Sequence, residues 1–329
     1  MSTDLSVLDL VVVPSGTPSS AAVRASIDLA RTAERCGYKR YWISEHHSMP
    51  SIASSAPEIL LARVAALTER IRIGSGGIML PNHVPLRVAE NFQTLAALYP
   101  DRIDLGLGRA PGSDARASRA LRAASGEQFS ALLSELVGLS RGTLPPEHPY
   151  HGVTVMPEDV ALPPIWILGS SGASAQAAGA AGMGYSFASH FSPAPAGPAL
   201  RDYREAFQPS AAFTEPHAIL GVSVICAATD EEAEHLAATV DLMWLHLRRG
   251  EFRPLPSPEE ALAYDYSPME RDAIQENRQR HVIGSPESVR RQLDTLMADS
   301  GANELMIVSN IHDPAKRLRS YELVAEAMR

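Results

Sequence analysis

The sequence has little of several features that mark common classes of protein. Only two cysteines, Cys36 and Cys226, occur in 329 residues, which is too few for a disulfide framework or a cysteine-based zinc site. Positive charge is in deficit, with 29 basic against 38 acidic residues and a net charge of −9. Electrostatic binding to nucleic acid or to an anionic membrane is therefore not expected.

Long apolar runs are also missing, and none approaches the roughly 20 residues that cross a bilayer. The first residues lack a basic region, and Leu5 to Pro14 has the pattern of a strand interrupted by Asp9, not of a signal peptide. Hydrophobic residues make up 45% of the chain, and no linker or fixed-period repeat divides it. These features predict one soluble domain, residues 1–329, in a reducing compartment such as the cytoplasm.

Short apolar runs alternate with helical stretches, a pattern typical of a parallel sheet covered by helices. The runs are Val7–Val13, Arg40–Ser44, Ile71–Met79, Ile103–Leu107, Ile165–Leu168, Tyr185–Ala188, Leu220–Ala227 and Leu305–Ser309. Eight such units form either an open doubly wound sheet or a closed barrel. The number eight favours the α/β class with a closed (β/α)8 TIM barrel.

Two segments are too long for simple strand-to-helix connections. Ala110–Asp159 follows the fourth predicted strand, and Glu231–Pro286 follows the seventh. Long insertions of this kind are usually lids, binding segments or mobile regions. In a barrel, insertions after strands 4 and 7 would lie at the carboxyl ends of the strands, where active sites are built.

Glu45, His46 and His47 come at the end of the second strand. Neighbouring strand residues point to opposite faces, so these three side chains are not expected to converge on one metal ion. A histidine here can be a structural residue of the barrel wall. We favour a role as proton donor or base, because the pKa of histidine lies near neutral pH.

Two glycine-rich stretches suggest close contact with a ligand. Gly74–Gly77 lies inside the third strand, where glycines indicate either tight packing or the approach of a flat ligand. Gly106–Gly112 follows the fourth strand, but its third glycine is one residue late for a dinucleotide-binding loop. Arg109 in this stretch is placed either to bind a phosphate or to form a surface ion pair.

A third stretch, Gly169-Ser170-Ser171-Gly172, joins the fifth strand to an alanine-rich helix. A turn of small residues before a helix presents free N–H groups and the positive end of the helix dipole to an anion. Simple capping of the helix by Ser171 or Ser174 is the alternative. We favour a phosphate site. After the sixth strand, Ser189-His190-Phe191 adds another histidine at the same end.

Taken together, these segments resemble the bacterial luciferase-like monooxygenase family. The resemblance rests on four motifs in one order: Tyr41–His47; Ile73–Pro81 with His83, Pro85, Arg87 and Glu90 after it; Arg102–Arg109; and Gly169–Gly172. It covers about Leu5 to Phe191, and the last third only through the strands around Val222 and Met306.

The resemblance implies a flavin at the carboxyl-end mouth of the barrel, with His46 in the position of the family's catalytic imidazole. Gly76 and Gly77 fall where members often have a non-prolyl cis peptide beside the isoalloxazine ring. Arg109 would hold the FMN phosphate together with Ser170 and Ser171 of the Gly169–Gly172 turn. Some members carry a reactive cysteine where this chain has Gly108, so no thiol chemistry is expected.

The implied reaction uses FMN reduced by a separate NAD(P)H-dependent reductase. Dioxygen then forms a C4a-hydroperoxyflavin that oxygenates a small organic substrate. We predict that Glu231–Pro286 closes over the site. Family members are commonly homodimers, and the alanine-containing helices at Pro57–Leu67 and Val84–Leu98 could pack against a second subunit. The alternatives are a deazaflavin-dependent hydride-transfer enzyme, a non-catalytic flavin-binding protein and a metal-dependent hydrolase.

Overall fold

The computed structural model describes residues 3–329. Its strands are β1 Asp4–Asp9, β2 Arg40–Ile43, β3 Arg72–Ser75, β4 Ile78–Met79, β5 Ile103–Gly108, β6 Ile165–Gly169, β7 Gly184–Phe187, β8 Ala218–Cys226, β9 His281–Gly284 and β10 Glu304–Val308. Its α-helices are α1 Ser19–Cys36, α2 Pro57–Ala65, α3 Pro85–Leu98, α4 Ala115–Ala120, α5 Phe129–Arg141, α6 Gly172–Ala180, α7 Ala196–Ala206, α8 Asp230–Arg248, α9 Pro258–Leu262, α10 Pro268–Arg278, α11 Pro286–Ser300 and α12 Pro314–Ala327.

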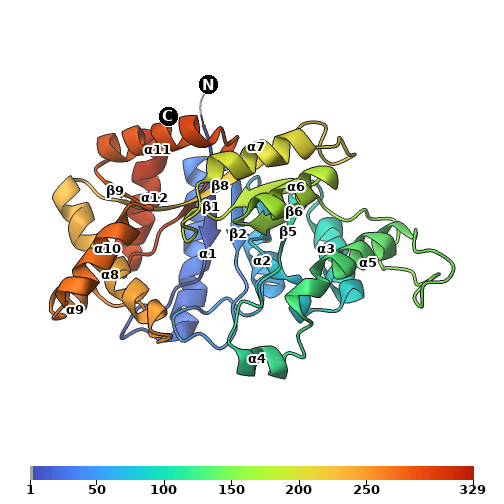
Figure 1. The fold of residues 1–329 in the computed structure, drawn as a ribbon, viewed down its shortest axis with the longest axis horizontal. Helices are drawn as coiled ribbons and strands as arrows, with labels where there is room; N and C mark the ends of the chain where they lie inside the picture. Colours follow the sequence, from blue (N-terminus) through green and yellow to red (C-terminus); the bar gives the residue numbers. More distant parts are fainter. Residues whose placement is uncertain (1–2) are drawn as a thin grey trace.

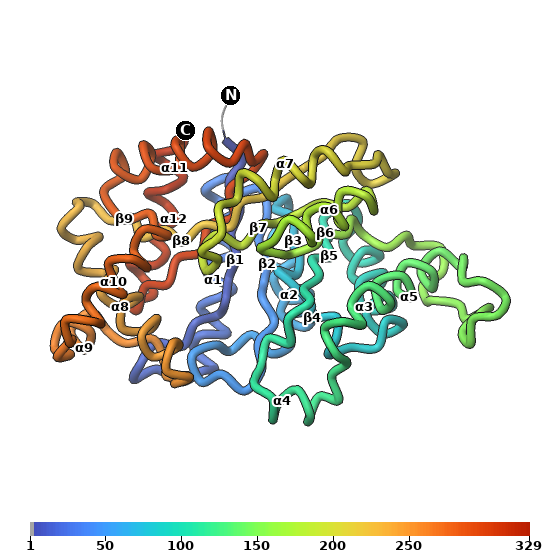
Figure 2. The backbone as a smooth tube through the Cα atoms, viewed as in Figure 1, coloured from blue at the N-terminus to red at the C-terminus, as the bar shows by residue number. Residues whose placement is uncertain are grey.

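Eight parallel strands form a closed barrel in the order β10, β1, β2, β3, β5, β6, β7, β8. The ring closes because β8 pairs with β10, with Ile219 opposite Glu304 and Ser223 opposite Val308. Helices surround the strands in Figure 1, and Figure 2 shows the same path as a continuous tube. The predicted (β/α)8 TIM barrel is confirmed. Within residues 3–329, no helix combines the length and apolar character required to cross a bilayer.

Both faces of the strands are buried, which explains why they are hydrophobic nearly throughout. Residues such as Tyr41 and Ile73 face the helices. Residues of the opposite parity meet inside the barrel, where Trp42 and Trp166 contact each other edge to face with ring centroids 5.5 Å apart. Gly74 makes room for this pair, since a Cβ there would lie 2.7 Å from Trp42 Nε1.

An ion cluster fills the amino end of the barrel. The Arg40 guanidinium donates to Asp104 at 2.8 Å and to Glu304 at 2.9 Å, and both carboxylates are fully buried. Burial alone would raise the pKa of Glu304, but the hydrogen bond from His217 and the charge of Arg40 lower it to about 2. Such a packed end contributes stability, which leaves the carboxyl end for chemistry.

Two predicted strands have different boundaries, and one strand was not predicted. The third strand is two pieces, β3 and β4, separated by Gly76 and Gly77, which are joined by a cis peptide bond. The first strand ends at Asp9 and does not reach Val13, because Val11 has φ 52° and its N–H donates to the Asp9 carboxylate at 2.8 Å. The strand β9 was missed, and it pairs with the carboxyl half of β8.

The two predicted insertions follow β5 and β8, but they are largely helical. The first contains α4, a short 3-10 helix at Gly126–Gln128, and α5. The second contains α8, α9, α10 and β9, elements that were not predicted from the sequence. Ser257 and Ser267 form capping boxes at the starts of α9 and α10. An ion pair between Arg278 and Asp241 at 2.7 Å joins α10 to α8. Closure of this second insertion over the site remains a prediction.

Candidate active site at the carboxyl ends of the strands

The barrel brings the sequence-predicted site residues to one end. His46 follows β2, Gly76 and Gly77 follow β3, and Arg109 follows β5. The β5–β6 register pairs Gly108 with Leu168, so Arg109 emerges beside Gly169 at the start of the β6–α6 turn. Parallel strands explain this convergence, because all their carboxyl ends lie on the same side.

Glu45 is the hub of this end of the barrel. One carboxylate oxygen accepts hydrogen bonds from His47 Nε2 at 2.8 Å and Asn82 Nδ2 at 3.0 Å. The other accepts from the Met79 N–H at 2.8 Å and His83 Nε2 at 2.9 Å. Burial by itself raises the pKa of Glu45, but the hydrogen bond and charge of His83, with the hydrogen bonds from Asn82 and His47, lower it below its usual value. The carboxylate therefore ties the loop after β2 to the segment after β4.

His46 is held differently, through its backbone. Its N–H donates to the Ser54 carbonyl at 3.0 Å, and the next N–H, that of His47, donates to the Gly112 carbonyl at 3.0 Å. The Nδ1 atom of His46 is buried and has no hydrogen-bond partner among residues 3–329. Burial lowers the pKa of His46, so the imidazole is neutral at pH 7. A neutral ring with an unsatisfied nitrogen can accept or donate a proton at this position.

Gly76 and Gly77 are required by packing. A Cβ on Gly76 would lie 2.5 Å from Leu8 Cδ1, and one on Gly77 would lie 2.7 Å from the Gly106 carbonyl oxygen. The tight-packing interpretation is therefore confirmed, and the cis peptide between them matches the family expectation. The absence of side chains also leaves bare backbone at the end of β3.

The β6–α6 turn is capped from within. Ser171 is the N-cap of α6, and its side chain accepts the Ser174 N–H. Ser174 Oγ lies 3.0 Å from the hydroxyl of Tyr185. The capping alternative is thus confirmed for Ser171, whereas the Ser170 side chain makes no hydrogen bond within residues 3–329. A Cβ on Gly172 would lie 2.5 Å from Asp202 Oδ2, so a carboxylate already stands near this helix end.

Sequence reasoning did not include His190 among the site residues. Its ring follows β7, and burial lowers its pKa to about 4, with His281 and His46 near enough to contribute. Its Nδ1 atom is buried and has no hydrogen-bond partner in the described chain. The ring packs against Gly221, where an added Cβ would lie 2.9 Å from Nδ1. His281, from the unpredicted strand β9, bonds Ser223 Oγ at 2.7 Å. The Ser-His-Phe motif was the only available signal.

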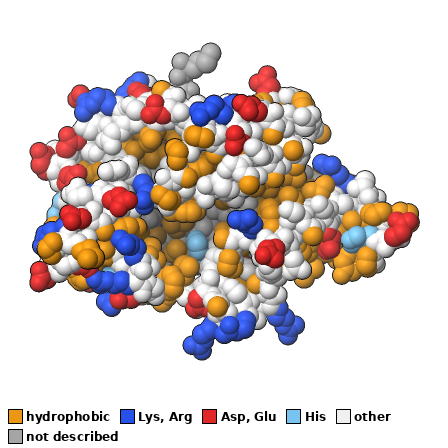
Figure 3. All heavy atoms as spheres, viewed as in Figure 1, with side chains coloured by type: hydrophobic (Ala, Val, Ile, Leu, Met, Phe, Trp, Pro, Cys, Tyr) orange, Lys and Arg blue, Asp and Glu red, His pale blue; other side chains and the backbone are white. Residues whose placement is uncertain are grey.

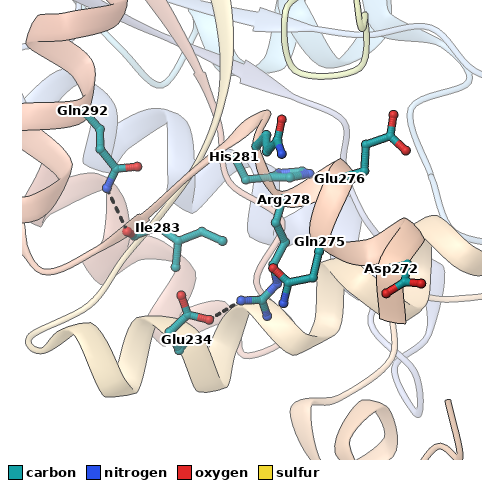
Figure 4. A pocket seen from close by; sticks show the side chains of 9 residues that line it. Glu234, Asp272, Gln275, Glu276, Arg278, His281, Ile283 and Gln292 are labelled. Carbon is teal, nitrogen blue, oxygen red and sulfur yellow. Dashed lines mark hydrogen bonds and ion pairs between the residues drawn. The ribbon is translucent and has the colours of Figure 1, made fainter. Parts of the chain in front are cut away.

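A cavity of about 800 Å³ lies elsewhere, between α8, α10, β9 and α11 (Figure 4). It is lined by carboxylates and amides, and the ion pair between Arg278 and Glu234 occupies one wall. Among the lining residues, His281 lies near enough to His190 to help lower its pKa. The cavity contains none of the predicted site residues, so we place the chemistry at the mouth, where the unsatisfied imidazoles lie.

Comparison with known proteins identifies the family. The family described as "Luciferase-like monooxygenase" matches residues 3–304. The chain belongs to the luciferase-like monooxygenase family. It is 42% identical over 324 residues to the "Luciferase-like monooxygenase" of Escherichia coli (strain K12), covering 98% of this chain and 96% of that one. The "N-acetyl-S-alkylcysteine monooxygenase" of Bacillus subtilis (strain 168) is 34% identical over 330 residues, 98% of both chains.

Solved structures agree with the family assignment. The structure of apo-MsnO8 superposes with a TM-score of 0.89 at 41% identity, covering 99% of this chain and 98% of that one. More distant folds include an FMN complex of a Pseudomonas putida monooxygenase component, at TM-score 0.72 and 19% identity, and an F420-dependent alcohol dehydrogenase, at 0.69 and 14%. These two show the fold alone. As a member of a monooxygenase family, the chain is an oxidoreductase.

Proposed function

We propose that this family member is a flavin-dependent monooxygenase that receives reduced FMN from a separate NAD(P)H-dependent reductase and uses O2 to oxygenate a small organic compound. The observation that carries the proposal is the neutral, unpartnered imidazole of His46 at the barrel mouth that also presents the bare backbone of Gly76 and Gly77. Family membership and the monooxygenases among its relatives support the reaction class.

The residues at the mouth fit a flavin. Buried polar atoms without partners in the described chain, His46 Nδ1 and Asn310 Oδ1, can bond a polar ring edge. Gly76 and Gly77 bring backbone without side chains to the end of β3, and Arg109 with Ser170 lies where a phosphate at the α6 N-terminus would sit. The reduced flavin, when bound, supplies the electrons that activate O2.

The remaining work belongs to the chain itself. His46 holds or moves a proton, because its neutral imidazole is buried at the mouth. Glu45 keeps the loop that carries His46 in place through His83 and the Met79 N–H. The aromatic and aliphatic side chains inside the barrel, including Trp42 and Leu8, exclude water from the floor of the site.

We further propose that the chain works in the cytoplasm as a homodimer. Large apolar side chains stand exposed on and beside α2 and α3: Ile59 is 73% exposed, Val84 66% and Leu98 61%. Exposed apolar side chains of this size gathered on neighbouring helices are typical of a subunit interface.

The decisive experiment is an anaerobic titration with reduced FMN, followed by tryptophan fluorescence, in parallel with reduced deazaflavin F420. Oxygen is then admitted while the flavin absorbance is recorded. We expect FMN to bind, and its return to the oxidised spectrum to be delayed relative to free FMN.

His46→Ala should raise the Kd for reduced FMN by no more than about tenfold, because it removes one hydrogen bond of about 0.5–1.5 kcal/mol and leaves the phosphate turn unchanged. It should shorten the delay at least about tenfold, the low end of what a positioned proton donor contributes. Binding of F420 alone would transfer the chain to the hydride-transfer class. Binding of FMN with no delay would indicate a non-catalytic flavin-binding protein.

A further inference from the structure

A group of arginines stands out on the segment between β5 and α5. Residues 109–122 contain four arginines and one acidic residue, Asp114, in a chain whose net charge is −9. Arg109, Arg116, Arg119 and Arg122 are all exposed. Asp114 does not neutralise them, because its carboxylate caps α4 by accepting the N–H groups of Arg116 at 2.8 Å and Ala117 at 2.7 Å.

These arginines have no ion pairs within the described part of the chain, in contrast to exposed arginines such as Arg87 and Arg291. Arg87 pairs with Glu90 at 3.0 Å and Arg291 with Glu287 at 2.7 Å. Within residues 3–329, no carboxylate lies within 4.0 Å of a guanidinium nitrogen of Arg109, Arg116, Arg119 or Arg122. We call Arg116, Arg119 and Arg122 the α4 arginine surface.

The α4 arginine surface lies at the rim of the candidate active site. Gly112, just before α4, bonds the His47 N–H, and a Cβ on Gly112 would lie 3.6 Å from His46 Nδ1. After α4, the Ala124 N–H donates to the Pro81 carbonyl at 2.7 Å, which ties the segment to the loop after β4. In Figure 1, α4 projects from the barrel, and Figure 3 shows basic side chains gathered over that projection.

Positive charge at the rim of the site can attract an anionic ligand. An anionic ligand that approaches a chain of net charge −9 is repelled at long range, except where unpaired positive charge is concentrated. Fields of this kind raise association rates by about 10- to 1000-fold, and they weaken as salt is added. FMN carries a phosphate that is close to dianionic at neutral pH, whereas riboflavin carries none.

We propose that the α4 arginine surface captures phosphorylated flavin from solution and guides it to Arg109 and the β6–α6 turn. The inference rests on the proposed function, since it needs a flavin that exchanges with solvent. The three arginines act on the encounter and not on the bound state. They therefore set how fast FMN associates, and make the chain select FMN over riboflavin kinetically.

The test compares association kinetics of charge-reversed variants. Arg116→Glu/Arg119→Glu is mixed anaerobically with reduced FMN or reduced riboflavin in a stopped-flow instrument, and tryptophan fluorescence is followed. The matched control is Arg63→Glu/Arg141→Glu, which changes the total charge equally. Both control residues are exposed in the last turns of α2 and α5, away from the α4 segment. Arg116→Gln/Arg119→Gln changes the charge by half as much and should give an intermediate rate of FMN association.

At an ionic strength of about 10 mM, where charges act over roughly 30 Å, we expect the α4 reversal to slow FMN association about tenfold. The control variant should stay within about twofold, and riboflavin association should not change. At about 1 M salt, where the screening length is roughly 3 Å, the difference should vanish. Dissociation rates should be equal throughout.

Equal FMN association rates in the wild type and the α4 variant at low salt would overturn the proposal and leave the proposed function intact. A faster dissociation with unchanged association would also overturn it, because the arginines would then be ligands of the bound phosphate. If the wild type binds neither flavin at any salt concentration, the capture role and the proposed function fail together.

Discussion

Replacing Glu45 by glutamine tests how the His46 loop is held. The carboxylate is fully buried and accepts four hydrogen bonds, two on each oxygen. Glutamine preserves the shape, but its amide nitrogen must face two of the four donors. The Met79 backbone N–H can only donate, so the remaining oxygen should stay on that side. The amide nitrogen then meets His47 and Asn82.

The expected cost follows from this geometry. His47 can accept a hydrogen bond from the new amide in one tautomer, but the Asn82 amide nitrogen cannot. One hydrogen bond to a charged acceptor is lost, and such bonds contribute about 1.5–3 kcal/mol each. We therefore expect Glu45→Gln to lower the free energy of unfolding by about 2 kcal/mol. Glu45→Ala, which leaves all four donors without their acceptor, should cost about 4 kcal/mol.

The pH dependence of stability gives a second signature. The folded-state pKa of Glu45 lies below its ordinary value of 4.5, so its contribution is complete above pH 4.5 and is lost as pH falls through the lowered pKa. His83 behaves oppositely. Burial opposes its charge, but the hydrogen bond and charge of Glu45 raise its pKa above 6.5, so its contribution is complete below pH 6.5 and is lost as pH rises through the raised pKa. The destabilisation by Glu45→Gln should therefore be largest between pH 4.5 and 6.5.

The assay is urea unfolding followed by both tryptophan fluorescence and circular dichroism at several pH values. Glu287→Gln is the control, because that exposed glutamate pairs only with Arg291 on the surface of α11 and should change little. If Glu45→Gln unfolds at the same urea concentration as the wild type at pH 6, the hydrogen bonds assigned to Glu45 do not hold this end of the barrel.

Two further predictions follow from packing. Gly77→Ala should destabilise the fold by about 3 kcal/mol, because its Cβ would meet the Gly106 backbone. Since this Cβ does not meet Leu8, the losses in unfolding free energy of Gly77→Ala and Leu8→Ala, measured in urea, should add in the double variant. Gly76→Ala, whose Cβ would lie 2.5 Å from Leu8 Cδ1 and 3.1 Å from Trp42 Cβ, should instead cost less in combination with Leu8→Ala than the sum of the two, and simple additivity would contradict the Leu8 contact. In sedimentation, the wild type should be a dimer and Ile59→Asp/Leu98→Asp a monomer. Leu262→Asp is the control, because Leu262 on α9 is also 61% exposed. A monomeric wild type would rule out the proposed interface.

Much of the architecture follows from local patterns in the sequence. Eight apolar runs separated by helices predict the barrel, because strands buried on both faces must be apolar throughout. The same order places Glu45–His47, Gly76–Gly77, Arg109 and Gly169–Gly172 at one end, because parallel strands share a carboxyl end. Boundaries were less accessible: Val11 looks like a strand residue, and only the hydrogen bond from its N–H to Asp9 shows why β1 has already ended.

The chemical state of the site was decided by tertiary structure. Glu45 meets Met79 and His83, which lie more than 30 residues away in sequence, so no local spacing reveals the hub. His190 and His46 follow different strands, and burial in the folded barrel lowers the pKa of both imidazoles. Sequence thus determined which residues reach the mouth. The folded structure determined which of them are paired, buried or exposed, because pKa values and hydrogen-bond partners depend on groups that only the closed barrel brings together.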